Sequence, residues 1–147
     1  MNTLSALAAP ALLAGLLAFA GPSVAQSTAP DAFTREALIR STLLTFNDAN
    51  MTGIYDVLRA RSSTPFQETY TAEQLAETFK VFRDQQIDLM VVAAMDPVEA
   101  GEPVFNEDGV MTLTGHFETQ PQQIKYEVEL LLEAGGWKMI GINVNIE

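Results

Sequence analysis

The sequence contains no cysteine, and its single histidine is His116. The absence of thiols excludes disulfides, cysteine nucleophiles, thiolate metal sites and a lipid anchor attached through cysteine. A lone histidine cannot build the usual zinc site with several histidine ligands, so we expect His116 to lie at the surface or at an interface. We therefore expect neither a metal nor another cofactor.

Basic residues are also few, because 8 Lys and Arg stand against 19 Asp and Glu and give a net charge of −11. The imbalance lies in the second half of the chain, since residues 84–147 carry twelve acidic and only two basic side chains. A field of this sign repels phosphate groups and excludes nucleic acid as a partner. A solvated acidic face explains the charge more simply than a cationic partner does.

Charged residues are missing altogether from residues 1–30. An apolar run from Leu12 to Ala20 is followed by the helix-breaking Gly21-Pro22 and by the small residues of Ser23-Val24-Ala25. This order is typical of a secretory signal peptide cleaved after Ala25. We predict a signal peptide over residues 1–25, a polar tether over residues 26–30 and a single domain over residues 31–147.

The alternative to cleavage is an uncleaved membrane anchor. The apolar stretch from Leu4 to Ala20 contains Pro10 and is shorter than the roughly 20 residues that a spanning helix needs. We therefore predict no stable membrane anchor. The product is expected to be exported, which means the periplasm in a Gram-negative cell.

The first half of the domain has a helical period. A helix is predicted over residues 31–49 and a shorter one, capped by Thr52, through about Arg61. Ser62-Ser63-Thr64-Pro65 is interpreted as a break between helices. Thr71-Ala72-Glu73-Gln74 has the pattern of a capping box and predicts a third helix. The inward residues are expected to be Phe33, Ala37, Ile39, Leu43, Leu44 and Phe46 on the first helix, Ile54, Val57 and Leu58 on the second, and Leu75, Phe79 and Phe82 on the third.

The second half has the period of strands. Residues 88–95 are predicted to be extended, although residues 89–94 alone also fit a helix. Pro97 and Pro103 flank an irregular or edge strand, and a turn at residues 106–109 precedes a strand over residues 110–118. The clearest alternation runs from Ile124 to Glu133, and a hairpin at residues 134–136 leads to a last strand over residues 137–146. Helices followed by an antiparallel meander predict the α+β class.

The last strand carries apolar residues at both parities: Trp137 and Met139 at one, and Ile140, Ile142, Val144 and Ile146 at the other. A terminal strand that is buried on both faces is either central in its sheet or covered by another subunit. We predict a homodimer contact through the sheet at this strand.

Several segments carry a resemblance to a known fold family. They are residues 71–75 leading to Phe79, residues 86–89, residues 108–110, residues 113–117 and residues 137–144. The chain resembles the NTF2-like superfamily, whose fold is a cystatin-like α+β cone, and within it a family of short exported bacterial proteins of unknown function. The resemblance implies three N-terminal helices packed on a curved antiparallel sheet. It leaves the function open, because such cones host isomerases, dehydratases and binding modules.

Enzymes of the ketosteroid-isomerase type in that superfamily use an Asp base with Tyr or acid donors in an apolar pocket. Tyr126 shares the inward parity of the clearest strand, while Glu127, Glu129 and Glu133 face outward. Asp56 and Asp96 are the candidate carboxylates. The catalytic candidates are thus Tyr126, Asp56 and Asp96, and the candidates for lining a ligand pocket are Tyr55, Phe79, Phe117 and Tyr126.

Three functions are compatible with these observations. The first is a non-enzymatic exported domain that binds a small apolar molecule inside the cone or a protein through its sheet. The second is a cofactor-independent isomerase or lyase that uses an Asp–Tyr pocket. The third is a structural subunit whose cone is filled by its own side chains. The first is our leading prediction, because catalysis needs convergent groups that the sequence does not place together.

Overall fold

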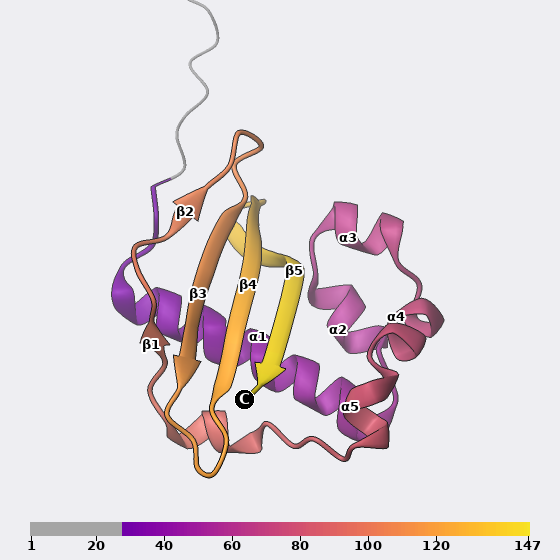
Figure 1. Ribbon diagram of the computed structural model, residues 1–147. Coiled ribbons are helices and arrows are strands. Elements are labelled where there is room, and N and C mark those ends of the chain that lie inside the picture. Colours follow the sequence, from indigo (N-terminus) through magenta and orange to yellow (C-terminus); the bar gives the residue numbers. More distant parts are fainter. Residues whose placement is uncertain (1–27) are drawn as a thin grey trace, which may run out of the picture.

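The computed structural model describes residues 28–147, so the predicted signal peptide and the first part of the predicted tether lie outside the described residues. Five α-helices come first, followed by a 3-10 helix and five strands (Figure 1). The helices are α1 (Ala32–Thr52), α2 (Asp56–Arg61), α3 (Thr64–Thr69), α4 (Ala72–Thr78), α5 (Lys80–Asp84) and the 3-10 helix η1 (Met90–Ala94). The strands are β1 (Val98–Glu99), β2 (Val104–Phe105), β3 (Met111–Phe117), β4 (Ile124–Glu133) and β5 (Gly136–Ile146).

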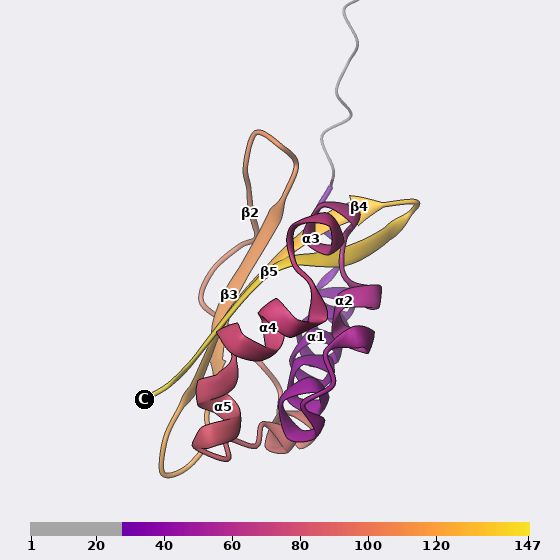
Figure 2. The same ribbon diagram turned by 90° about the vertical axis from the view of Figure 1, so that its right-hand side faces the viewer.

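The sheet is open and wholly antiparallel, in the order β1-β3-β4-β5, with β2 pairing the other end of β3. Helix α1 lies across one face of this sheet, and the shorter helices gather beside β5 (Figures 1 and 2). The predicted α+β class and the antiparallel meander are confirmed. We call the face toward α1 the inner face and the opposite face the outer face.

Helix α1 begins at its N-cap Asp31, whose carboxylate accepts the N–H of Thr34, and ends at Gly53 in the left-handed conformation with φ 72°. Its core side carries Ile39, Leu43 and Phe46, as predicted. The inclusion of Phe33 and Ala37 was wrong, because both side chains are exposed, that of Phe33 to 82%. Phe33 precedes Ile39 by six residues and therefore lies about 120° away around the helix.

The short helices differ from the prediction in number and bounds. Helix α2 begins at Asp56 instead of Thr52, and it buries Leu58 but leaves Ile54 and Val57 exposed. The segment interpreted as a break instead starts helix α3, because Ser63 caps it and a proline fits its first turn. The capping box of Thr71 is confirmed at α4.

The segment before the sheet is not extended, so that prediction was wrong. Residues 90–94 form the 3-10 helix η1, within the range for which the helical alternative was noted. Asp88 starts this helix, since its carboxylate accepts the N–H of Met90 at 2.8 Å. The buried Asn47 of α1 fixes the same point by accepting the N–H of Leu89 at 2.8 Å and donating to Asp88 at 3.0 Å.

Strand β5 explains why apolar residues occur at both parities of the last strand. Leu130 pairs with Met139 but Glu129 pairs with Gly141, so Ile140 is the extra residue of a β-bulge. The bulge shifts the parity by one. Met139 on one side of it and Ile142, Val144 and Ile146 on the other therefore all pack against the same core.

This bulge removes the argument that led from sequence to a homodimer. β5 is also not central, because it is the last strand of the sheet order within the described chain. The homodimer itself stays a prediction.

Candidate functional site

The four residues predicted to line a ligand pocket are parts of the packed core. Tyr55, Phe117 and Tyr126 are 1%, 0% and 3% exposed. The rings of Tyr55 and Phe79 stack at 6.3 Å between centroids, whereas Phe117 contacts Tyr126 at 5.6 Å. The four residues thus form two separate aromatic pairs.

The Tyr55 hydroxyl has a fixed environment within the first pair. It donates to Asn50 at 2.5 Å and accepts from Arg83 at 2.8 Å. Burial raises the pKa of Tyr55, and the Arg83 guanidinium opposes that rise. A phenol held in this way stabilises the junction of α1 and α5 and remains neutral at neutral pH.

The three catalytic candidates are not brought together. Asp56 lies exposed in the first turn of α2. The Asp96 side chain is 92% exposed and forms an ion pair with Arg40 at 3.2 Å. The Tyr126 hydroxyl is buried and has no hydrogen-bond partner among residues 28–147. No carboxylate in the described chain is therefore placed to exchange a proton with that phenol.

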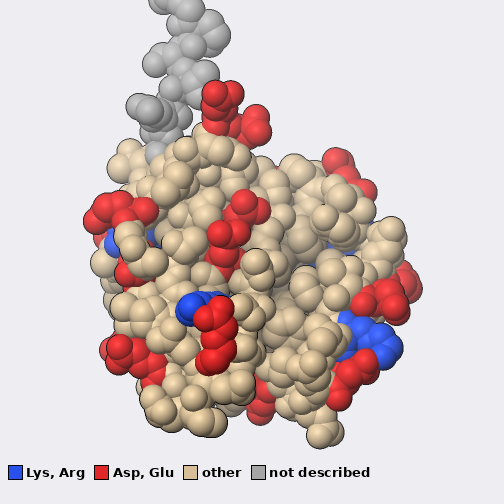
Figure 3. All heavy atoms as spheres, viewed as in Figure 1, with Lys and Arg blue, Asp and Glu red and all other residues tan. Residues whose placement is uncertain are grey.

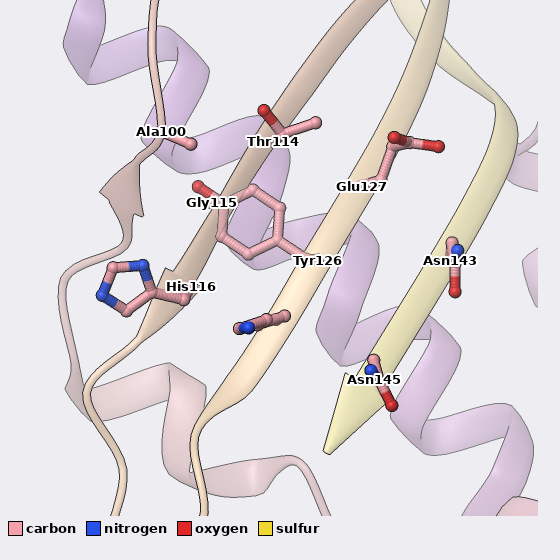
Figure 4. Close-up of a pocket in the computed structure, with 9 residues that line it drawn as sticks. Ala100, Thr114, Gly115, His116, Tyr126, Glu127, Asn143 and Asn145 are labelled. Atoms are coloured by element: carbon pink, nitrogen blue, oxygen red, sulfur yellow. The ribbon is translucent and has the colours of Figure 1, made fainter. Parts of the chain in front are cut away.

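Tyr126 has neighbours that the sequence did not reveal. In register order, Glu99 lies opposite Gly115, which lies opposite Tyr126, and all three face inward. Because Gly115 has no side chain, the ring of Tyr126 extends across it toward β1 (Figure 4). Burial, and secondarily the charge of Glu99, raise the pKa of Tyr126 above its ordinary value of 10.0.

The carboxylate of Glu99 is already engaged by α1. Arg35 binds it through Nε at 2.9 Å and through a second nitrogen at 3.0 Å, and both side chains are largely buried. A bidentate pair of this kind engages both carboxylate oxygens of Glu99. We interpret the Arg35–Glu99 ion pair as the tie between α1 and β1, at the edge of the sheet.

The outer face of the sheet carries a different set of side chains. A shallow cavity of about 310 Å³ lies over β3, β4 and β5 at this face. Six polar side chains line it, and Ala100, Gly115 and Tyr126 complete the lining (Figure 4). We call these six the outer-face array: Thr114, His116, Lys125, Glu127, Asn143 and Asn145.

The register of the strands arranges the outer-face array in two rows of three. His116, Lys125 and Asn145 are cross-strand neighbours, and Thr114, Glu127 and Asn143 form the parallel row. Neighbours within a row are about 4.8 Å apart, and the rows are separated by about 7 Å along the strands. The array thus offers a flat lattice of hydrogen-bonding groups.

Most of these groups are free to bind a ligand. Within residues 28–147, the side chains of Thr114, His116, Glu127 and Asn143 make no hydrogen bond. Lys125 is paired with Glu147, which also accepts from Asn145 at 2.7 Å. Glu127 therefore has no cationic partner in the described chain, and acidic groups outnumber basic ones on this face (Figure 3). The array therefore presents both hydrogen-bond donors and hydrogen-bond acceptors.

The sequence indicated part of this site. His116 was expected at the surface or at an interface, and its side chain lines the cavity on the outer face. Lys125, Asn143 and Asn145 were not singled out, because outward polar residues are ordinary on a half-exposed sheet. The one signal that could have identified them is that they occupy outward positions on strands that pair with one another in the sheet. Among the described residues, no group of three or more His, Cys, Asp or Glu side chains is placed to hold a metal ion.

The fold and the site define an α+β domain with an open antiparallel sheet and a polar outer face. Comparison with models of protein families, with curated protein sequences and with solved structures gives no match. No helix within residues 28–147 combines the length and the apolar character needed to cross a membrane.

Proposed function

We propose that this chain is an exported, non-enzymatic binding domain that holds a small polar ligand on the outer face of its sheet. The observation that supports the proposal is the outer-face array, in which a cavity of about 310 Å³ is lined by polar side chains of three adjacent strands. Amide, hydroxyl, imidazole and carboxylate groups together suit a ligand rich in hydroxyl and amide groups. Export rests on the signal peptide predicted over residues 1–25.

The inner face of the sheet supports this choice, because it leaves less space for a ligand. Its residues Met111, Leu113 and Phe117 of β3 and Val128 and Leu130 of β4 are buried against the helices. A small apolar ligand in the cone would need space that these side chains fill. The isomerase or lyase alternative would need a carboxylate hydrogen-bonded to the Tyr126 hydroxyl, and within the described chain no carboxylate makes that hydrogen bond.

The proposal includes membership of the NTF2-like superfamily. Its support is the order of elements, with helices before an antiparallel meander, and the long β4–β5 ribbon that bends around the helices (Figure 2). The homodimer remains a separate prediction, to be tested by the mass of the protein in solution.

A fragment screen by ligand-observed NMR tests the function. The probes are small neutral molecules rich in hydroxyl and amide groups, together with an equal set of apolar fragments. We expect polar fragments to bind the mature chain and to lose binding in the double variant His116→Ala, Asn143→Ala. The matched control is Asp56→Ala, an exposed change far from the array. Binding of apolar fragments alone, or equal binding to the double variant, would contradict the proposal.

A further inference from the structure

A second groove lies between β5 and the short helices. It has a volume of about 330 Å³ and is lined on the helix side by Phe66, Leu75 and Phe79 and on the strand side by Ile140 and Ile142. The hollow is visible in the space-filling view, to the right of the centre of the molecule (Figure 3). Its apolar floor and its position beside the last strand of the sheet distinguish it from the outer-face array, with which it shares only Glu127 and Asn143.

The backbone of β5 faces this side with free hydrogen-bonding groups. Gln123 and Glu147 exchange both of their backbone hydrogen bonds, at 2.6 and 3.0 Å. Because such pairs alternate along an antiparallel ladder, the N–H and C=O groups of Ile142, Val144 and Ile146 point away from β4. Within the described residues, none of these groups has a backbone partner.

At one point along this edge of β5, another part of the chain provides a hydrogen-bond partner. The C=O of Met139 accepts the N–H of Ser63, at the start of α3, at 2.8 Å. Beyond the bulge at Ile140 the chain offers no such cover. The uncovered part of the edge is therefore the stretch over residues 142–146, next to the apolar groove.

The charge at this edge is unbalanced. Gly141 pairs with Glu129 and has no side chain, so the carboxylate of Glu129 extends over it: a Cβ built on Gly141 would lie 2.1 Å from Glu129 Oε2. Glu127 and Glu129 both line the groove, which has no lysine or arginine in its lining. Neither carboxylate has an ion-pair partner within residues 28–147.

We propose that the edge of β5 accepts an extended segment of a partner protein as an added strand. Main-chain hydrogen bonds to Ile142, Val144 and Ile146 would align the segment, and its apolar side chains would enter the groove. A lysine or arginine of the segment would meet the carboxylate of Glu129 across Gly141. The partner is thus a strand-forming peptide with alternating apolar and basic residues.

A second copy of this chain fits the edge less well. Each chain carries a net charge of −11, and pairing two copies of β5 would bring the carboxylates of Glu129 near each other. The one basic residue of β5 is Lys138, which lies beyond the bulge and is near Glu133 at 3.7 Å. Charge complementarity therefore favours a basic partner at this edge over the homodimer contact that the sequence predicted at the last strand.

The test uses two synthetic peptides with alternating valine and threonine, one with a central lysine and the other with glutamate in its place. We expect the lysine peptide to shift the amide signals of residues 142–146 in an NMR titration of residues 26–147. Glu129→Gln should weaken its binding by about two- to fivefold, the range of a partly exposed ion pair. Glu129→Lys should reverse the preference toward the glutamate peptide.

Val144→Pro tests the backbone contacts. The N–H that proline removes points away from β4, so the β4–β5 ladder remains and the peptide should lose its binding. If this variant does not fold, the charge reversal at Glu129 still decides the question. Equal binding of the two peptides, or shifts outside the groove, would overturn the proposal. So would a dimer in solution that Glu129→Lys or Val144→Pro abolishes, because a second copy would then occupy the edge.

Discussion

Gly115 on β3 is the position where one added methyl group should do the most damage. A Cβ at this residue would lie 2.2 Å from the carbonyl oxygen of Val98, 2.5 Å from the hydroxyl of Tyr126 and 2.8 Å from its Cζ atom. The Val98 oxygen belongs to the backbone of β1, which is paired with β3. The Tyr126 ring is buried and packs against Phe117. Gly115→Ala must therefore displace backbone.

Overpacking a core costs about 1–3 kcal/mol, and we place Gly115→Ala at about 3 kcal/mol because a carbonyl oxygen is one of the clashing atoms. Gly141→Ala should cost less, since the atom nearest its added Cβ is the end of the flexible Glu129 side chain at 2.1 Å. Gly101→Ala should be nearly neutral, because nothing lies within 4 Å of its added Cβ. Urea unfolding followed by the fluorescence of Trp137 measures all three free energies.

The double variant Gly115→Ala, Tyr126→Phe separates the two clashes. Removing the hydroxyl relieves the contact at 2.5 Å but leaves the contact with Val98, so only part of the stability should return. If Gly115→Ala unfolds at the same urea concentration as Gly101→Ala, our description of this edge of the sheet is refuted.

Tyr126→Phe alone should leave stability unchanged or raise it by about 1 kcal/mol, because it removes a buried hydroxyl without a partner. Folding raises the pKa of the Tyr126 phenol, so its contribution to the stability of the wild type is complete below pH 10.0 and decreases above it. The stability of the phenylalanine variant should decrease less, as urea titrations below and above that pH would measure. Asn47→Ala should cost about 2 kcal/mol, since it leaves the N–H of Leu89 unpaired, and urea unfolding checks this value. Mass spectrometry of the protein exported from a Gram-negative host should find Gln26 as the first residue, and retention of residues 1–25 would contradict the predicted cleavage.

Local patterns in the sequence predicted α4 and β4. The capping box at Thr71 is local, because its two hydrogen bonds join residues three apart in the chain. The alternation from Ile124 to Glu133 indicates one buried face, although the backbone partners of β4 come from β3 and β5. The start of α3 was missed because Ser-Thr-Pro is common to both breaks and helix caps. The sequence left residues 89–94 open between a strand and a helix, because Asn47, more than forty residues away, fixes the start of η1.

The bulge at Ile140 shows why the face of β5 could not be assigned from its own residues. Only the pairing with β4 determines where one residue is skipped, and that skip turns two apparent apolar faces into one. The outer-face array also depends on how the strands pair. Its six residues are ordinary outward positions on three separate strands, and they become a lattice only through strand register.

Mapping the bound polar fragment by backbone amide NMR tests the central claim most directly. The outer-face site predicts that the largest shifts occur at Thr114, His116, Lys125, Asn143 and Asn145, with the buried Tyr55 and Phe117 unaffected. Shifts concentrated at Tyr55 and Phe117 would contradict the account, because they would place the ligand in the core that we describe as filled.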